Sequence, residues 1–208
     1  MKTGTGRTLV LLRHAETSWN AERRYQGQTD IPLNDVGREQ ARVLRSQLLR
    51  HAHLFDPERT AVIASDLLRA KETAQLVFSE HTIHSEPELR EIRFGIFEGL
   101  TRKEIETRFA PELARWEQDE PGFAIAGGEP KDQVRRRAVA ALERWLAEVA
   151  HPTLVVVTHG GVLRQLMNHV REQQQGGPFD VASQVSYANG AMHVLHVDRG
   201  VWGYAGGF

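Results

Sequence analysis

Short runs of apolar residues alternate along the chain with longer segments in which apolar residues recur every three or four positions. The short runs are typical of buried strands, and we predict strands over residues 7–12, 60–64, 82–85, 153–158 and 191–197. The periodic segments are typical of helices with one buried face, and we predict helices over residues 35–50, 66–78, 102–109, 111–117, 129–150 and 160–170. This alternation predicts an α/β fold, a three-layer, doubly wound, mostly parallel sheet with helices on both faces.

One stretch departs from this alternation. Residues 94–128 contain Pro111, Pro121 and the pair Gly127–Gly128 around two short helical patterns. We expect a small helical insertion here, which would act as a lid beside the sheet. No linker or repeat interrupts the 208 residues, a length that suits one core, so we expect a single domain over residues 1–208.

Two of the predicted strands end in basic side chains. The first strand runs into Arg13 and His14, and the strand over residues 153–158 runs directly into His159 and Gly160. In a parallel sheet the carboxyl ends of the strands share one edge, and ligands bind in the crevice outside that edge. We therefore expect two imidazoles and a guanidinium to meet there.

Composition excludes several kinds of chemistry. The chain has 26 basic and 27 acidic residues and a formal net charge of −1, so nothing electrostatic favours nucleic acid or an anionic membrane as a partner. It has no cysteine, which excludes thiolate metal sites and thiol-based phosphatases and fits a reducing compartment. The longest early apolar run, residues 9–12, is too short for a signal-peptide core or a membrane span. We therefore expect a cytoplasmic location.

Five short motifs, in order along the chain, carry the candidate chemistry. They are Arg13-His14-Ala15-Glu16-Thr17 followed by Trp19-Asn20, then Tyr25-Gln26-Gly27, then Ser65-Asp66-Leu67-Leu68-Arg69-Ala70 with Thr73-Ala74, then Glu91 with Phe94-Gly95 and Glu98-Gly99, and finally Thr158-His159-Gly160-Gly161. Together they resemble the histidine phosphatase superfamily, the phosphoglycerate-mutase-like enzymes, and its phosphatase branch in particular. Ala15 stands where the family most often has glycine, but a small residue is retained. Any one motif is a weak signal, whereas five in register are a strong one.

The resemblance implies a role for each of these polar residues. His14 would be the nucleophile that is phosphorylated, and Glu91 the general acid that protonates the leaving oxygen. The phosphoryl group would be held by Arg13, Arg69 and His159. The residues expected to bind the substrate are Asn20, Gln26, Gly27, Gly160 and Arg102.

The chemistry of phosphoryl transfer agrees with these roles. Transfer needs a nucleophile in line with the leaving oxygen and positive charge around the equatorial oxygens. Two guanidiniums beside His14 would keep its imidazole neutral through like-charge repulsion, and they would bind a phosphate dianion through paired hydrogen bonds. Because Arg13 and Arg69 already balance the charge of the dianion, we expect neither a metal nor a cofactor, and a small phosphorylated metabolite as the partner.

Two other functions stay open. A cofactor-dependent phosphoglycerate mutase would use the same residues, although such mutases carry a longer insertion over the site than the stretch between Glu91 and Glu129 provides. A non-catalytic module that binds a phospho-ligand or a protein would not need the full set, so retention of both His14 and Glu91 argues against it. The sequence does not reveal which phosphomonoester is the substrate, and it is compatible with a homo-oligomer.

Overall fold

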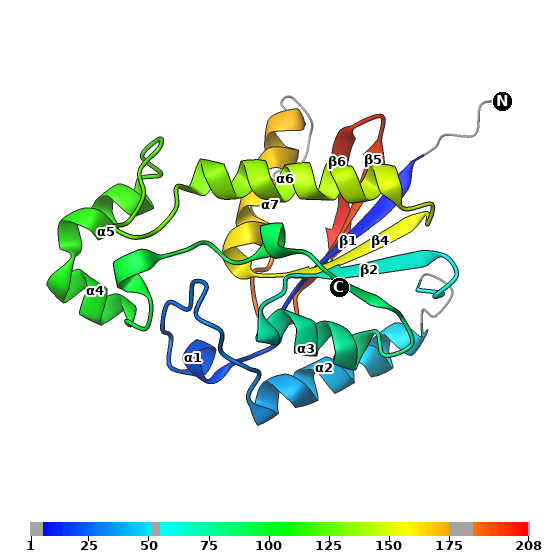
Figure 1. The fold of residues 1–208 in the computed structure, drawn as a ribbon, viewed down its shortest axis with the longest axis horizontal. Helices are drawn as coiled ribbons and strands as arrows, with labels where there is room; N and C mark the ends of the chain where they lie inside the picture. The colour runs from blue at the N-terminus through cyan, green and yellow to red at the C-terminus, as the bar shows by residue number, and fades with distance from the viewer. Residues whose placement is uncertain (1–5, 51–54, 175–184, 208) are drawn as a thin grey trace.

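The computed structural model describes residues 6–50, 55–174 and 185–207 of the chain (Figure 1). Its centre is a six-stranded sheet with the order β3-β2-β4-β1-β5-β6. The strands are β1 (Arg7–Arg13), β2 (Thr60–Ala64), β3 (Ile83–Ser85), β4 (Thr153–Thr158), β5 (Met192–Asp198) and β6 (Val201–Gly207). The apolar side chains of β1 and β4 are almost fully buried, as continuous apolar runs in the middle of a sheet predict.

Four of the strands run parallel, and the other two form an antiparallel hairpin. β3, β2, β4 and β1 are parallel, so their carboxyl ends share one edge of the sheet. β5 pairs antiparallel with β1, and β6 pairs antiparallel with β5. Arg199 and Gly200, both with positive φ, form the two-residue turn between β5 and β6, a geometry that tight hairpins favour. The sheet is therefore mostly parallel, as predicted, with one additional strand, β6.

Helices cover both faces of the sheet (Figure 1). One face carries α6 (Lys131–Glu148) and α7 (Gly160–Gln173), and the other carries α2 (Asp35–Leu48) and α3 (Leu68–Val77). Each face has its own hydrophobic core because successive strand residues point to opposite sides. Leu9 and Leu11 of β1 belong to the core under α6 and α7, whereas Val10 and Leu12 belong to the core under α2 and α3.

Three short helices lie beyond the carboxyl ends of the parallel strands (Figure 1). They are α1 (Ser18–Ala21), α4 (Arg102–Arg108) and α5 (Ala110–Glu117), and two 3-10 turns, η2 (Pro87–Leu89) and η3 (Gly95–Phe97), precede α4. Ile105 of α4 and Leu113 of α5 bury their side chains in the same core as α6 and α7. The stretch expected to form a lid thus contains two helices, α4 and α5. Both pack into the hydrophobic core on the face of the sheet that carries α6 and α7.

Two helices begin later than the apolar period predicts. α3 begins at Leu68 rather than at residue 66, and α6 begins at Lys131 rather than at residue 129. The residues freed in this way include Glu129, whose side chain pairs with Arg137 in the network described below. Over the described residues, no helix combines the length and the apolar character that a membrane span requires.

Candidate active site

His14 and His159 follow directly after the two central strands. β1 ends at Arg13 opposite Thr158 of β4, so the next residue of each strand emerges at the same edge of the sheet. The backbone N–H of His14 also donates to the carbonyl of Thr158 at 2.9 Å. The centroids of the two imidazole rings are 5.2 Å apart, and both side chains are almost completely buried. The structure thus brings together the two histidines that the sequence places at strand ends.

The hydrogen bond of His14 fixes its tautomer. Its Nδ1 lies 2.7 Å from the carbonyl oxygen of Ala15, which can only accept, so Nδ1 carries the proton and Nε2 keeps its lone pair. Burial, together with the neighbouring guanidiniums of Arg69 and Arg13, lowers the pKa of His14 well below its usual value of 6.5. At neutral pH this side chain is therefore a neutral imidazole with a free nitrogen lone pair.

Arg69 determines the tautomer of His159 in the same way. Arg69 Nε donates to His159 Nδ1 at 3.2 Å, so the proton of His159 is on Nε2, which donates to Ser65 Oγ at 2.8 Å. Burial and the charge of Arg69 lower the pKa of His159 well below 6.5. Burial lowers the pKa of Arg69 itself to about 10, so this arginine stays cationic at neutral pH. A neutral His159 therefore lies against a buried guanidinium.

The loop between α1 and α2 holds Arg69 in place. Arg69 Nη1 donates to the carbonyl of Thr29 at 2.9 Å, and Nη2 donates to the carbonyl of Gly27 at 2.7 Å. Gly27 has a φ of 53°, and a Cβ built there would lie 2.0 Å from Glu98 Oε1, so only glycine fits. Gly27 thus contributes to the site through its carbonyl, which orients Arg69.

Asn20 and Gln26 present amide groups beside His14. Thr17 Oγ1 lies 2.9 Å from Gln26 Oε1, and the N–H of Thr17 donates to Asn20 Oδ1 at 3.1 Å. Asn189 Nδ2 donates both to Asn20 Oδ1 at 3.2 Å and to the carbonyl of His14 at 3.0 Å. These bonds occupy the side-chain oxygens, and within the described part of the chain they leave the two NH₂ groups free to donate to a ligand.

Arg13 lies against the first residue of α7. Its Nη1 donates to the carbonyl of Tyr187, whereas its buried Nε has no partner among the described residues. A Cβ on Gly160 would lie 3.3 Å from Arg13 Nε and Cζ, so glycine lets the guanidinium approach the helix backbone closely. Burial lowers the pKa of Arg13, and the charge of Glu91 opposes that effect. Arg13 thus offers a buried N–H donor that no described residue uses.

The Glu91 carboxylate is bound to the N-terminus of α7. Its Oε2 accepts from the N–H of Gly161 at 3.0 Å, and its Oε1 accepts from the N–H of Ile92 at 2.9 Å. A Cβ on Gly161 would lie 2.4 Å from Glu91 Oε1, so the glycine leaves the space that this carboxylate occupies. Glu91 is therefore fixed at both oxygens beside the two strand-end histidines.

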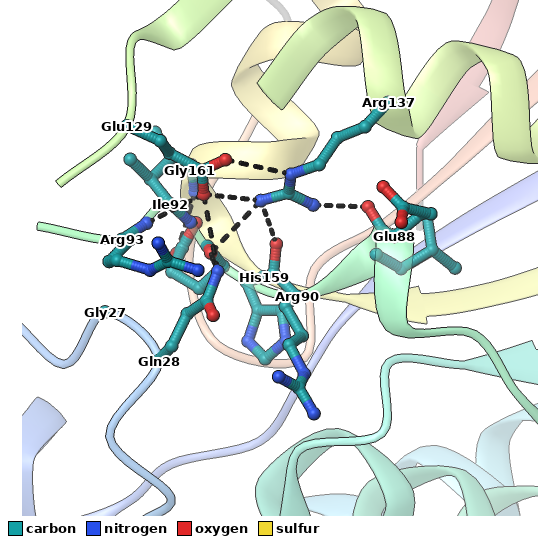
Figure 2. A network of polar contacts seen from close by, with 12 residues as sticks. Gly27, Gln28, Glu88, Arg90, Ile92, Arg93, Glu129, Arg137, His159 and Gly161 are labelled. Carbon is teal, nitrogen blue, oxygen red and sulfur yellow. Dashed lines mark hydrogen bonds and ion pairs between the residues drawn. The ribbon is translucent and has the colours of Figure 1, made fainter. Parts of the chain in front are cut away.

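Arg137 holds the backbone on which Glu91 sits. Figure 2 shows its side chain reaching from α6 toward Glu129 and toward the backbone around Arg90. Arg137 Nη2 donates to the carbonyls of Arg90 at 2.7 Å and of Glu91 at 3.2 Å, while Nη1 donates to the carbonyl of Glu88. One guanidinium thus satisfies three backbone acceptors within four residues of chain.

Glu129 completes this network from the other side. Its Oε1 lies 2.8 Å from Arg137 Nη2 in an ion pair whose two side chains are 9 and 13% exposed. The same oxygen accepts from the N–H of Arg93 at 2.9 Å and from Gln28 Nε2 at 3.3 Å, and Gln28 Nε2 also reaches the carbonyl of Glu91 at 3.1 Å (Figure 2). The network therefore ties the Glu91 segment to α6 and to the loop that orients Arg69.

The site residues line two adjoining cavities. The inner cavity has a volume of about 270 Å³, and the residues that line it include His14, Asn20, Gln26 and Arg69. The outer cavity has a volume of about 590 Å³ and lies between the start of α7 and the residues of α4 and α5. The two cavities share the lining residues Arg13, Tyr25, Glu91 and Phe94. A ligand whose phosphate lies beside His14 would therefore extend into the outer cavity.

Arg102 lies at the outer cavity, and its charge is already paired. Its Nε is 2.7 Å from Glu106 Oε1, and its Nη1 bonds to Glu117. The side chain is 57% exposed, so it lies at the rim and not beside His14. Arg102 thus lines the outer cavity but not the inner cavity that His14 lines.

Comparison with known proteins assigns this arrangement to a family. The profile of the histidine phosphatase superfamily, branch 1, matches residues 9–205. This chain belongs to that superfamily. The matched residues include every motif on which the resemblance depends.

Curated relatives of this histidine phosphatase carry two kinds of name. Phosphoglycerate mutase-like protein 4 of Arabidopsis thaliana is 37% identical over 172 residues, which cover 78% of this chain and 70% of that protein. The metal-independent phosphoserine phosphatase of Arabidopsis thaliana is 33% identical over 199 residues, which cover 93% of this chain and 78% of that protein. Among solved structures, Bacillus stearothermophilus YhfR is similar with a TM-score of 0.80 and 33% identity, covering 95% of both chains.

The histidine phosphatase site contains several residues that the sequence motifs do not include. They are Arg137, Glu129, Asn189 and Tyr187. The sequence could have indicated Arg137, because it follows Val134 by three residues and precedes Ala141 by four, and both of these residues are buried. This spacing places Arg137 on the inner face of its helix. Asn189 and Tyr187 lie in a polar segment without periodicity, where nothing in the sequence marks them.

Proposed function

We propose that this histidine phosphatase is a phosphomonoester hydrolase that acts on a small phosphorylated metabolite through a phosphohistidine at His14. The observation that carries the proposal is the neutral His14 side chain, whose free Nε2 belongs to a cavity lined also by Arg13 and Arg69. A nucleophilic imidazole beside two guanidiniums has the composition that phosphoryl transfer requires.

The first step transfers the phosphoryl group to the enzyme. His14 Nε2 attacks phosphorus, and the N–P bond forms as the bond between phosphorus and the leaving oxygen breaks. Arg13, Arg69 and the free NH₂ groups of Asn20 and Gln26 surround the three equatorial oxygens. His159, whose two ring nitrogens bond to Arg69 and Ser65, acts by holding Arg69 in place. Glu91, in its protonated form, gives its proton to the leaving oxygen, so the first product departs as an alcohol. The bond from His14 Nδ1–H to the carbonyl of Ala15 stabilises the positive charge that the ring acquires.

The second step hydrolyses the phosphohistidine. The Glu91 carboxylate takes a proton from a water molecule whose oxygen attacks phosphorus on the face that the alcohol has left. The N–P bond breaks, inorganic phosphate departs, and His14 returns to the neutral imidazole with its proton on Nδ1. The N–H of Gly160, the first residue of α7, provides further stabilisation for the phosphate anion.

A phosphoglycerate mutase is the second candidate, and the relatives' names divide between the two activities. A mutase must return the phosphoryl group to a second substrate before water removes it. We take residues 94–128 as the lid of a single domain, and its helices α4 and α5 are short, about two turns each. The relative named a phosphatase also aligns with 93% of this chain, against 78% for the mutase-like relative. Both observations favour hydrolysis.

Trapping the intermediate tests the proposal. Brief exposure to ³²P-labelled p-nitrophenyl phosphate, quenched at alkaline pH, is expected to leave acid-labile label on His14, located by peptide mass spectrometry. His14→Asn should lose the label and more than about 10³-fold in turnover, whereas Arg42→Gln, on the exposed face of α2, should retain both. Near wild-type turnover in His14→Asn refutes the mechanism. Interconversion of phosphoglycerates that outpaces hydrolysis in the presence of 2,3-bisphosphoglycerate would instead establish the mutase.

A further inference from the structure

We infer that Gln40 of α2 is a positioning residue for His14: its side-chain oxygen holds and polarises the peptide whose carbonyl accepts the Nδ1 proton of that histidine. The inference rests on the proposed function, because it concerns the nucleophile of the same reaction. Gln40 does not line the cavity that His14 lines, so it acts through the backbone that lies between the two side chains.

The peptide between Ala15 and Glu16 connects Gln40 to His14. Its carbonyl oxygen, that of Ala15, lies 2.7 Å from His14 Nδ1, and its N–H, that of Glu16, donates to Gln40 Oε1 at 3.0 Å. The two bonds thus lie at opposite ends of one planar amide. An amide whose N–H donates a hydrogen bond has a carbonyl that accepts more strongly, because each bond in such a chain polarises the next. Gln40 therefore strengthens the bond that fixes the tautomer of His14.

Thr73 of α3 holds the preceding peptide, on the other side of Ala15. Thr73 Oγ1 accepts from the N–H of Ala15 at 3.0 Å and donates to the carbonyl of Arg69 at 2.7 Å, and both bonds are buried. Once this peptide is fixed, the direction of the Ala15 carbonyl depends only on the two backbone rotations of Ala15 itself. The bond from Glu16 to Gln40 restricts those rotations, so the carbonyl stays directed at the His14 ring.

The first turns of α2 fit closely against the backbone of Glu16. The N–H of Asn34, the N-cap residue, donates to the carbonyl of Glu16 at 3.1 Å, and Asn34 Nδ2 donates to the Glu16 carboxylate at 2.8 Å. A Cβ on Gly37 would lie 2.0 Å from the same carbonyl oxygen, so only glycine permits this approach. Gln40 follows Gly37 by three residues and so lies on the same face of the helix. The start of α2 thus places Gln40 Oε1 against the N–H of Glu16.

The bond from His14 Nδ1 matters most when the ring is charged. Attack of Nε2 on phosphorus gives the imidazole a positive charge, and its Nδ1–H then donates to a neutral peptide carbonyl. Hydrogen bonds from charged donors are roughly twice as strong as those between neutral groups, so a polarised carbonyl stabilises the phosphorylated ring more than the resting ring. Arg13 and Arg69, which are assigned to the phosphate, lie outside α2. Loss of the Gln40 acceptor is therefore expected to lower kcat more than it raises KM.

Three variants of α2 test the inference by kinetics. Gln40→Met keeps the length of the side chain but removes its acceptor, and it is expected to lower kcat for p-nitrophenyl phosphate about fivefold while KM changes less than about twofold. Gln40→Glu restores an acceptor of the same reach and should recover most of the lost kcat. Gln47→Met, the same substitution at an exposed position of α2, should leave kcat and KM unchanged.

Nuclear magnetic resonance of ¹⁵N-labelled histidine observes the same bond without turnover. The signal of the Nδ1 proton of His14, assigned by its loss in His14→Asn, is expected to move upfield in Gln40→Met, as it does when a hydrogen bond weakens, and to return in Gln40→Glu.

The two readouts separate this inference from the proposed function. If His14 is phosphorylated but the Nδ1 proton signal is the same in Gln40→Met as in the wild type, or if Gln40→Glu does not recover kcat, the inference is overturned while the phosphatase stands. If no phosphohistidine forms in the wild type but the signal moves in Gln40→Met, the phosphatase is wrong and the positioning of His14 by Gln40 stands.

Discussion

His14 and His159 occupy matching positions after neighbouring parallel strands, with their ring centroids 5.2 Å apart inside the protein. Both are neutral, because burial and the charge of Arg69 lower the pKa of each well below 6.5. Protonating either ring would place a new positive charge beside a buried guanidinium. The site therefore keeps His14, the proposed nucleophile, neutral by making protonation of both rings unfavourable.

This relationship predicts a dependence of stability on pH. In the unfolded chain each imidazole binds a proton as the pH falls through about 6.5, whereas the folded rings stay neutral to a lower pH. The contribution of each histidine to the free energy of unfolding is therefore full above pH 6.5 and is lost as the pH falls below it. The slope approaches about 1.4 kcal/mol per pH unit for each ring.

Denaturant unfolding at pH 7, 6 and 5 measures this slope. We expect the free energy of unfolding of His14→Asn to fall less steeply between pH 6 and pH 5 than that of the wild type, by up to about 1.4 kcal/mol per pH unit. Comparing the two proteins removes the contribution of the carboxylates, which titrate alike in both. Parallel curves would show that His14 is as easily protonated in the folded state as in the unfolded chain.

Charge balance predicts a reaction that needs no metal. Arg13 and Arg69 supply two positive charges to a phosphate dianion, the role that a divalent cation otherwise plays. Excess EDTA should therefore leave kcat and KM unchanged for any monoester that is turned over. Vanadate, which adopts a five-coordinate geometry close to that of the transition state, should inhibit competitively. Loss of activity in EDTA that Mg²⁺ or Zn²⁺ restores would contradict this account.

Gly161→Ala is predicted to impair catalysis more than stability. The new Cβ would lie 2.4 Å from Glu91 Oε1 and 2.7 Å from Ile92 Cδ1, so the carboxylate must move away from the leaving oxygen. A displacement of about 1 Å at a catalytic group costs on the order of 10²-fold in rate. Gly203→Ala is the matched control, because its Cβ would approach Gln174 Nε2 no closer than 3.4 Å. Steady-state kinetics and thermal unfolding of both variants separate the two effects, and equal kinetics in the two would show that Glu91 tolerates the shift.

The sequence predicts the central layers because their signals are local. The parallel strands β1, β2 and β4 follow from continuous apolar runs, and the meeting of His14 with His159 follows from the shared carboxyl edge of such strands. β6 escapes prediction because Val201–Gly207 contains Gly203, Gly206 and Gly207, which break any alternation of polar and apolar residues. Its place is set by pairing with β5, a tertiary contact.

The motifs identify the side chains that we propose to face the phosphate but not the residues that hold those side chains in place. Arg137 binds backbone carbonyls 46 to 49 residues away, and such acceptors leave no mark in side-chain composition. Glu129 is predicted as the first residue of the helix over residues 129–150, but it lies before α6 and its carboxylate accepts from the N–H of Arg93 instead. Supporting contacts of this kind depend on how loops fold against helices, which local propensity does not determine.

Arg137→Gln is predicted to lower kcat while leaving KM nearly unchanged. The guanidinium fixes the carbonyls of Glu88, Arg90 and Glu91, so its loss frees the segment that carries the general acid without touching the phosphate pocket. The variant also leaves Glu129 buried without its partner, which is expected to cost about 3 kcal/mol of stability. Glu129→Gln in the same chain should recover part of that loss, because it removes the unpaired charge.

The readouts for Arg137 distinguish positioning from simple destabilisation. Arg136→Gln removes a neighbouring exposed guanidinium, which among the described residues pairs only with Asp132, one turn earlier on α6. It should change neither kcat nor the unfolding midpoint appreciably. If Arg137 acts through Glu91, the pH profile of kcat changes shape in Arg137→Gln. Arg137→Lys is then expected to recover stability better than rate, because a compact ammonium cannot reproduce the spread of donors over the two Nη atoms that bind the carbonyls of Glu88, Arg90 and Glu91. A variant that loses stability but keeps the wild-type kcat and pH profile well below its unfolding temperature would leave Arg137 with a structural role only.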